Sequence, residues 1–417
     1  MTSTKPYEIS KRKVLEAYRK VRANDGGAGI DGESIEMFAA DLQGNLYKLW
    51  NRLSSGSYFP PPVREVSIAK KQGGVRKLGV PTVADRIAQE LVKQRIEGDL
   101  EDLFHEDSYG YRRGKSAEQA LAVTRERCWK YCWCVEFDIR RAFDELDWEL
   151  LSRAIHKHVK DPWALLYLQR WLKAPAVNEE GQRVERSAGV PQGSVIGPVL
   201  MNLYLHYAFD AWMQREYPRL PFARYADDAV AHCRSEAEAQ GLLQAIQARL
   251  KQCKLVMHPE KSGVVYCQPN RRSRPEYSRI QFTFLGYTFR PRRSGKARTS
   301  FLPAVSREAI KDMYSEMRQW KLPRQSSVSV VELARRYDPI LRGWLEYYGM
   351  FYRSTLRVVF DHFDRLLARW ARKKYRRFTR HPRRSHAWVR RVAQRSPRLF
   401  SHWLLFGTAT VRTMGAV

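Results

Sequence analysis

Two adjacent carboxylates, Asp227 and Asp228, interrupt the strand-like run FARYADDAVAHC at residues 222–233. Strand interiors disfavour aspartate, so the pair needs an explanation beyond local propensity. A third carboxylate, Asp138, closes another apolar run, CWCVEFD. Hard divalent cations prefer oxygen ligands of this kind and share them with substrate phosphates. Two such ions could activate an attacking hydroxyl and steady the leaving oxygen in phosphoryl transfer.

Neighbouring residues of a strand point to opposite faces. Asp227 and Asp228 can therefore be equal ligands only if they lie in a turn. We predict Asp138 and Asp227 as the main metal-binding, catalytic pair, with Asp228 contributing less directly. Adjacent aspartates alone are a weak signal, because they occur by chance in many turns. The strand before Asp138 and the hairpin pattern around Asp227 strengthen the prediction.

The elements that must position these acids mix helices with short strands, which indicates an α+β fold. Beyond about residue 300 the pattern favours helices without further strand alternation. There, Ile310, Met313, Met317 and Trp320 form an apolar stripe that we interpret as core packing. Earlier in the chain, helices are predicted over residues 8–22, 82–104, 148–172 and 235–253, and a hairpin is predicted to turn at Gly73–Gly74.

The composition indicates a globular protein with a polyanionic partner. The 417 residues include 74 Lys and Arg against 44 Asp and Glu, a formal net charge of +30. Basic side chains that neutralise phosphates release condensed counterions, which favours nucleic acid. An acidic membrane surface is the competing partner, but no span resembles a basic amphipathic membrane helix. No signal peptide or transmembrane run is evident, so we expect a soluble, cytoplasmic, nucleic-acid-associated protein without membrane contact.

The cysteines do not predict a metal site. Cys128, Cys132 and Cys134 cluster in CWKYCWC, but no second short-spaced pair follows, as a zinc site would require. We expect buried, reduced thiols.

A basic run covers residues 369–398, with thirteen Arg or Lys and no acid. Such a run can be only a solvated face. Here aromatic residues are interleaved with the charges, which favours phosphate contact combined with base stacking. The aromatic residues are Trp370, Tyr375, Phe378 and Trp388.

Several stretches together resemble a known family. VEFDIRRAFDEL (135–146), GVPQGSVIGPVLMNLYL (189–205) and RYADDAV (224–230) resemble the polymerase blocks of reverse transcriptases. Further stretches narrow the resemblance to bacterial group II intron-encoded reverse transcriptase/maturases, in the form that lacks the C-terminal endonuclease domain. These are NDGGAGIDG (24–32), KKQGGVRKLGVPTVADRIAQ (70–89), SYGYRRGKSAEQAL (108–121), LRGWLEYYG (341–349) and LFSHW (399–403).

The resemblance implies a right-hand polymerase with an antiparallel palm sheet. Residues 1–60 would be an N-terminal extension with an extra block, and residues 61–298 the fingers and palm. Residues 299–375 would form an all-helical thumb or maturase domain, and residues 376–417 a basic DNA-binding region.

The resemblance also assigns roles to individual residues. Asp138, Asp227 and Asp228 would bind metal. Lys70 and Arg76 would grip the incoming triphosphate, the alternative being ordinary exposed hairpin charges.

Further assignments concern the nucleotide pocket and the nucleic acid. Phe143 would be a steric gate against the ribonucleotide 2′-hydroxyl, the alternative being core filling. Gln192 and Lys261 would line the nucleotide pocket. Phe284, Leu285, Gly286 and Tyr287 would form the primer grip. Within the basic run, the nucleic-acid-binding residues would be Arg376, Arg377, Arg380, Arg383, Arg384, Arg390 and Arg391.

The implied activity is RNA-directed DNA synthesis from a primer 3′-hydroxyl, with two Mg²⁺ ions and dNTPs. The implied partners are a group II intron RNA, bound as a ribonucleoprotein for splicing and retrohoming, an RNA template with a DNA primer, and target DNA. Because the chain ends at Val417 without an endonuclease domain, insertion would need a primer from elsewhere, such as a replication fork. Two alternatives stay open: a domesticated reverse transcriptase in host DNA repair or defence, and a non-enzymatic splicing factor.

Overall fold

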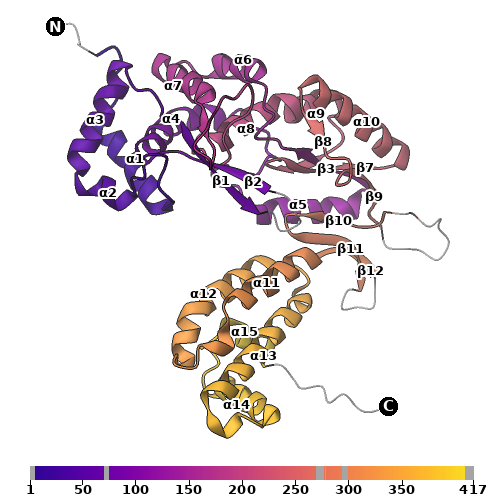
Figure 1. Ribbon diagram of the computed structural model, residues 1–417. Coiled ribbons are helices and arrows are strands. Elements are labelled where there is room, and N and C mark those ends of the chain that lie inside the picture. The colour runs from indigo at the N-terminus through magenta and orange to yellow at the C-terminus, as the bar shows by residue number, and fades with distance from the viewer. Residues whose placement is uncertain (1–4, 70–74, 269–276, 278, 294–298, 409–417) are drawn as a thin grey trace. The chain divides into compact units, whose positions relative to one another are not determined.

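The computed structural model describes residues 5–69, 75–268, 277, 279–293 and 299–408. The chain divides into two compact units, residues 1–120 with 134–264 and residues 121–133 with 265–417 (Figure 1). Lys70 and the predicted Gly73–Gly74 turn lie outside the described residues. Within the described ranges, no helix combines the length and the apolar character needed to cross a bilayer.

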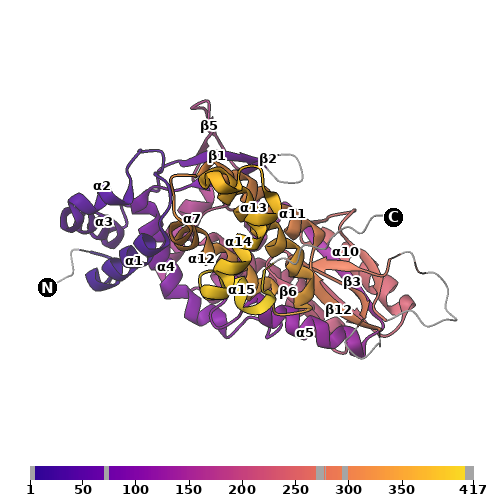
Figure 2. The same ribbon diagram turned by 90° about the horizontal axis from the view of Figure 1, so that it is seen from below.

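The N-terminal helices gather at one end of the first unit, where α1 and α3 pack against α4 (Figures 1 and 2). In α1 the buried residues Val14, Ala17, Tyr18 and Val21 follow helical spacing. The helix predicted near residues 8–22 is therefore confirmed, with its start at Lys11. The bounds are α1 Lys11–Asn24, α2 Ile35–Ala40, α3 Leu42–Ser55 and α4 Val83–Glu101.

The first sheet has the strand order β2-β1-β4-β5. Its β1 and β2 are antiparallel, with a register that runs from Arg64 opposite Val80 to Ala69 opposite Val75. The two strands predicted for this stretch are thus confirmed. The bounds are β1 Val63–Ala69, β2 Val75–Val80, β4 Ala176–Val177 and β5 Arg183–Val184.

Helix α4 is largely buried and carries a buried carboxylate, Asp85. Asp85 accepts hydrogen bonds from Tyr58 Oη (2.8 Å), Trp171 Nε1 (2.7 Å) and Gln89 Nε2 (2.8 Å). Because its amide nitrogen donates to Asp85, Gln89 turns its oxygen Oε1 toward residues 194–196. There it accepts from the Val195 backbone N–H at 2.8 Å. The carboxylate therefore orients an amide that ties α4 to the loop after Gly193.

The buried Asp85 makes folding stability depend on pH. Burial is the main reason why its pKa rises from 3.8 to about 6, despite three hydrogen bonds that lower it. Since the folded pKa lies above the unfolded one, this group's contribution is fully present below about pH 4 and is lost as pH rises through 6. In urea unfolding, the free energy of unfolding of the Asp85→Asn variant should rise relative to that of the wild type by on the order of 3 kcal/mol between pH 4 and 7. A difference that stays constant with pH would contradict this.

The second sheet of the first unit has the path β6-β7-β3-β8. The β6–β7 and β3–β8 pairs are antiparallel, which agrees with the antiparallel sheet expected. The central strand β3 is buried along most of its length, as its run of β-formers predicted. The bounds are β3 Trp133–Arg140, β6 Phe222–Tyr225, β7 Asp228–Cys233, β8 Val256–Met257 and β9 Gly263–Tyr266.

The remaining helices include one correction. The single helix predicted over residues 148–172 is two helices, which are separated where Asp161 precedes Pro162. Proline is favoured at the first helical position, because its fixed φ suits a helix and the N–H that it lacks would have no partner within the helix there. The bounds are α5 Ala117–Lys130, α6 Trp148–His158, α7 Pro162–Lys173, α8 Gly197–Leu205, the π-helix η1 His206–Asp210, α9 Ala211–Glu216 and α10 Glu236–Gln252.

The second unit contains an antiparallel sheet of order β10-β11-β12. The sequence favoured helices alone after about residue 300, and this was wrong for β12. Its residues pair with β11 from Thr299 opposite Arg293 to Val305 opposite Tyr287. Pro303 is tolerated because β12 is an edge strand. The bounds are β10 Phe282–Phe284, β11 Tyr287–Arg293 and β12 Thr299–Val305.

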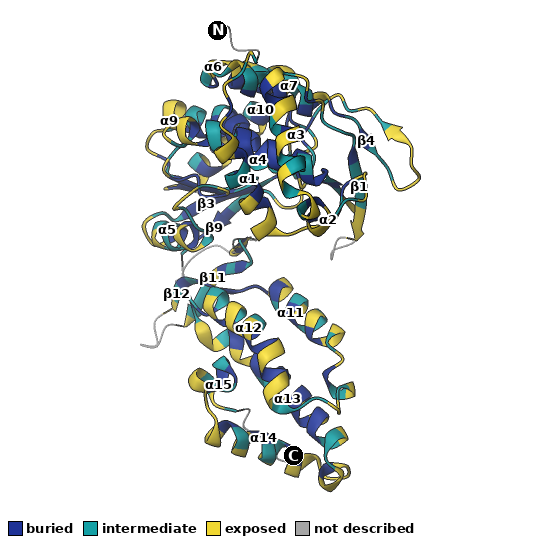
Figure 3. Ribbon diagram, turned by 90° about the vertical axis from the view of Figure 1, so that its left-hand side faces the viewer, coloured by how far each residue is buried: buried dark blue, intermediate teal, exposed yellow. Residues whose placement is uncertain are grey.

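The helices that follow β12 share one hydrophobic core (Figure 3). The stripe expected to be core packing is confirmed: Met313 and Met317 are buried, and Ile310 and Trp320 pack against the core. The core includes residues from 305 to 403, so the C-terminal helices pack with the others. The bounds are α11 Arg307–Gln319, η2 Leu322–Arg324, α12 Val330–Tyr348, η3 Arg353–Leu356, α13 Arg357–Lys374, η4 Arg376–Phe378, α14 Pro382–Arg395 and α15 Ser401–Phe406.

Candidate active site

The aspartate pair lies at a hairpin turn and not inside a strand. Tyr225 pairs with Asp228 across β6 and β7, so Ala226 and Asp227 are the two turn residues. Ala226 has a φ of 58°, a left-handed conformation that L-residues other than glycine adopt at a cost. Asp228 is the first residue of β7. The pair therefore lies at the hairpin end and not within a strand, so the low strand propensity of aspartate does not count against it. The two carboxylates start from different backbone environments, one in the turn and one at the first position of β7.

Asp138 lies in β3 and carries a cation partner. Its Oδ2 is 2.7 Å from Nζ of Lys261. Burial lowers the pKa of Lys261, but the hydrogen bond to Asp138 and the charges of Asp138, Asp228 and Asp227 raise it overall. The structure therefore brings Lys261, a predicted nucleotide-pocket residue, into direct contact with a predicted metal ligand.

The Asp227 carboxyl is perturbed by its surroundings. Burial raises its pKa first, and the negative charge of Asp138 raises it further. A backbone hydrogen bond, Lys261 and Arg76 act in the opposite direction without cancelling the rise. A carboxyl group whose pKa is raised by burial and by a neighbouring carboxylate is a common feature of sites that bind a cation or transfer a proton.

The donor chemistry of these residues fits a hard divalent cation. Asp138 and Asp227 supply carboxylate oxygens, and a cation between them would relieve the repulsion that raises the pKa of Asp227. Among the residues described, no three His, Cys, Asp or Glu side chains are grouped closely enough to hold a metal ion. The protein residues thus fit part of a coordination shell, and the assignment of Asp138, Asp227 and Asp228 as ligands stays a prediction.

Two predicted nucleotide-pocket residues contact each other. Arg76 Nε donates to Gln192 Oε1 at 2.5 Å. The loop that carries Gln192 packs backbone to backbone on β2, where the Gly79 N–H donates to the Gln192 carbonyl at 2.7 Å. A Cβ on Gly193, whose φ is 108°, would lie 2.6 Å from the Gly79 carbonyl oxygen. Glycine is therefore required where the loop meets β2.

Phe143 lies at the edge of the same region and is only partly buried. Its carbonyl oxygen accepts from the Val190 N–H at 2.8 Å. A Cβ built on Gly197 would be 3.6 Å from Phe143 Cε1. Partial burial is compatible with a steric gate and with packing at the edge of the core, so the steric-gate role of Phe143 stays a prediction.

The predicted primer grip belongs to the second unit. Phe284 pairs with Tyr287, so Leu285 and Gly286 form a two-residue turn with φ of 50° and 77°. Hairpins favour such turns because their twist matches that of the strands. Tyr347 Oη donates to the Leu285 carbonyl at 2.9 Å. The turn is thus held by α12, which contains all of the LRGWLEYYG motif except its last residue.

All seven predicted nucleic-acid-binding arginines between residues 376 and 391 are exposed. The base stacking expected of the interleaved aromatic residues is wrong for two of them. Trp370 is fully buried and Phe378 is 4% exposed, because both rings belong to the core of the second unit. Tyr375 and Trp388 also pack against that core. The aromatic spacing reflects the buried face of helices, and the arginines occupy the opposite face.

Sequence reasoning missed two residues beside the turn. Tyr111 has a φ of 59°. Burial raises its pKa, and the charge of Asp227 raises it further. Arg224 is 1% exposed within β6. A signal for Arg224 was present, because a charged residue in an apolar strand run needs a buried partner. For Tyr111 the sequence contains no comparable signal.

Comparison with known proteins assigns the chain to a family. The family model "Reverse transcriptase (RNA-dependent DNA polymerase)" matches residues 68–289, more than half of the chain. The model "Group II intron, maturase-specific domain" matches residues 310–388. The chain belongs to the reverse transcriptase family and carries a group II intron maturase-specific domain. This confirms the resemblance and the fold class, an α+β right-hand polymerase followed by a helical region.

The matches between this chain and individual relatives cover only part of each relative. Group II intron-encoded protein LtrA of Lactococcus lactis subsp. cremoris is 33% identical over 193 residues, 46% of this chain and 32% of LtrA. Protein YkfC of Escherichia coli (strain K12) is 33% identical over 216 residues, 49% of this chain and 55% of YkfC. A chain in a structure of telomerase from Candida albicans with a telomeric RNA fragment has a TM-score of 0.45 at 10% identity, covering 90% of this chain and 68% of that one. The matches thus span about a third to about half of the two curated relatives.

Proposed function

We propose that the protein is an RNA-directed DNA polymerase that extends a primer 3′-hydroxyl on an RNA template. The observation that carries this proposal is the grouping of Asp138, Asp227 and Lys261 beside one hairpin turn, in a chain of the reverse transcriptase family. Mg²⁺ held by Asp138 and Asp227, with Asp228 contributing less, would neutralise charge on the attacking and leaving oxygens.

The chain's own residues would bind and orient the dNTP substrate. Arg76, held by Gln192, presents a guanidinium that suits two phosphate oxygens, and Lys70 would act with it. Lys261 would exchange its partner, from the Asp138 carboxylate to a substrate phosphate. Phe143 would exclude the 2′-hydroxyl, and the turn at Leu285–Gly286 would position the primer. Orientation of this kind removes a large part of the barrier to a bimolecular reaction.

Primer extension by the full chain tests this proposal. Purified protein is incubated with poly(rA)/oligo(dT), dTTP and Mg²⁺, and the labelled primer is resolved by length. We expect extension with dTTP and little with UTP. Binding of the template–primer without any extension would overturn the polymerase proposal and favour a non-enzymatic RNA-binding factor.

We further propose that the region from residue 299 onward binds a group II intron RNA and assists its splicing and retrohoming, with contacts to target DNA beyond residue 375. The maturase-specific match and the seven exposed arginines support this. The setting would be the bacterial cytoplasm. Intron sequence flanking the gene would favour this maturase role, and the RNA transcribed from it should splice faster at low Mg²⁺ when the protein is added. Flanks without an intron would favour a domesticated polymerase.

The exposed arginines predict a salt-dependent contribution to nucleic-acid binding. Changing Arg383, Arg384, Arg390 and Arg391 to glutamine should weaken binding. The slope of log affinity against log salt should flatten by about 0.7–0.9 for each phosphate that the variant no longer neutralises. Fluorescence anisotropy between low and moderate salt measures both effects.

A matched control changes four arginines that already have acidic partners. Arg12, Arg153, Arg183 and Arg215 are mostly exposed and pair with Glu16, Glu149, Glu185 and Glu216. Their replacement removes the same charge but should leave the slope nearly unchanged. Equal slopes for both quadruple variants would mean that the basic run is only a solvated face.

A further inference from the structure

A buried arginine lies directly behind the turn that carries Asp227. The Arg224 side chain is 1% exposed, and its partner Asp210 is 0% exposed. The guanidinium makes a two-pronged contact, Nε to Oδ1 at 2.7 Å and Nη2 to Oδ2 at 2.5 Å. Asp210 is the last residue of the π-helix η1, a rare element that is often found at functional sites.

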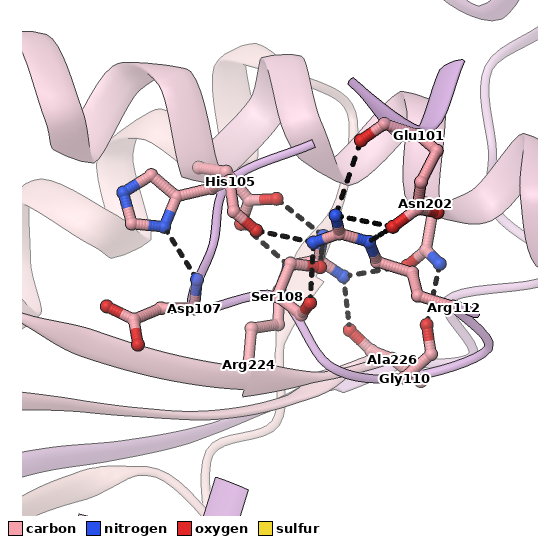
Figure 4. Close-up of polar contacts among 10 residues, drawn as sticks. Glu101, His105, Asp107, Ser108, Gly110, Arg112, Asn202, Arg224 and Ala226 are labelled. Atoms are coloured by element: carbon pink, nitrogen blue, oxygen red, sulfur yellow. Dashed lines mark hydrogen bonds and ion pairs between the residues drawn. The ribbon is translucent and has the colours of Figure 1, made fainter. Parts of the chain in front are cut away.

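The remaining guanidinium N–H groups are also satisfied (Figure 4). Nη2 donates to Ser108 Oγ at 2.8 Å, and Nη1 donates to Asn202 Oδ1 at 3.1 Å. The second Nη1 bond goes to the Ala226 carbonyl oxygen at 2.9 Å. A guanidinium has five N–H donors, and all five are used here. Such complete use fixes the position of the group, because any displacement breaks several bonds at once.

The bond to the Ala226 carbonyl reaches the turn itself. This oxygen belongs to the peptide group that links Ala226 to Asp227, so its direction determines where the Asp227 side chain starts. Ala226 has a φ of 58°, a conformation that persists in non-glycine residues only where surrounding structure enforces it. The backbone of Gly110 also packs tightly against the turn, because a Cβ on Gly110 would lie only 2.4 Å from the Ala226 nitrogen. Asn202 Nδ2 donates to the Gly110 carbonyl at 2.7 Å and ties this packing to Arg224.

We propose that Arg224 is a positioning residue: with Asp210 and Asn202 it enforces the left-handed conformation of Ala226 and thereby aims the Asp227 carboxylate at the reaction site. This inference rests on the proposed polymerase function. It differs from a role in core stability alone, because it depends on the strained conformation of Ala226.

The test separates positioning from folding. Removing one partner leaves a buried unpaired charge and destabilises a protein strongly, whereas apolar replacement of both partners is often tolerated. We therefore use Arg224→Met combined with Asp210→Leu. A milder variant, Arg224→Lys, keeps a positive charge for Asp210 but lacks the planar guanidinium that also reaches the Ala226 carbonyl. Both variants serve as backgrounds for a further substitution. Thermal unfolding and template–primer affinity show which of these two variants folds. A variant that folds should have a kcat per bound template–primer that is lower than that of the wild type by about tenfold or more.

Ala226→Gly supplies the decisive measurement. Glycine adopts positive φ without the cost that alanine bears, so the turn no longer needs to be enforced. Added to either background, Ala226→Gly should recover kcat several-fold while leaving the unfolding temperature of that background unchanged. Arg170→Met is the matched control, since Arg170 Nη1 also bonds two carbonyl oxygens, those of Gly56 and Tyr58, far along the chain from the turn. This control should lower the unfolding temperature but not kcat.

Two outcomes would overturn the inference while the polymerase function stands. One is a folded Arg224 variant with wild-type kcat. The other is a loss of kcat that Ala226→Gly does not relieve in either background, which would assign Arg224 to core stability. Wild-type protein that binds template–primer but does not extend it would instead overturn the proposed function, and the inference with it.

Discussion

Asp227→Asn should lower primer extension about a thousandfold while affinity for template–primer RNA stays near that of the wild type. The amide keeps the shape of the side chain but loses the charge that a divalent cation needs. A preorganised electrostatic group of this kind is worth about a hundredfold to a thousandfold in rate. Single-turnover extension on poly(rA)/oligo(dT), with binding measured separately, checks the prediction.

Stability provides the control for this variant. Burial and the charge of Asp138 raise the pKa of Asp227, so the charged carboxylate is less favourable in the folded protein than in the unfolded chain. Removing the charge should therefore leave the unfolding temperature equal or higher. Asp99→Asn, at a side chain that is 60% exposed beside Arg95, should change neither rate nor stability. Undiminished synthesis by Asp227→Asn would refute the metal assignment.

Phe143→Ala should raise the efficiency of ribonucleotide incorporation relative to deoxyribonucleotide incorporation, by up to about a hundredfold. Phe143 is only partly buried, and the hydrogen bond that its carbonyl accepts from the Val190 N–H anchors its backbone. Truncation to alanine opens space where a 2′-hydroxyl would otherwise clash. The ratio of kcat/KM for UTP and dTTP on the same template–primer measures the change.

The alternative role of Phe143, core filling, predicts a different pattern of results. If the ring only fills the core, the variant should unfold at a lower temperature with an unchanged ratio. Phe59→Ala, at a ring that is 70% exposed and remote in sequence from the proposed pocket, should leave both quantities at wild-type values.

Much of the site could be predicted because its signals are local. The acids at positions 138, 227 and 228 stand out within apolar runs of a few residues. Helices such as α1 and α10 follow from spacing along their own segments. Errors arose where local patterns are ambiguous: β12 contains a proline that hides an edge strand, and the break before Pro162 divides one apolar pattern into two helices.

The basic run shows how one pattern can have two causes. Alternating arginines and aromatic residues are equally compatible with a stacking surface and with an amphipathic helix. Only packing distinguishes these cases, and it buries Trp370 and Phe378 while leaving the arginines exposed. The burial removes the aromatic part of the argument for phosphate binding, which now rests on the exposed arginines of an acid-free run.

The amino-acid sequence by itself determined the family, the fold class and the candidate chemical groups, because these follow from residue types in short ordered blocks. The tertiary structure decided that the aspartate pair occupies a turn, that Lys261 pairs with Asp138, and that Arg224 reaches Asp210 and Ser108. Lys261 and Asp138 are 123 positions apart, and Arg224 and Ser108 are 116 apart. Contacts at such separations depend on how whole elements pack, and no local spacing rule encodes them.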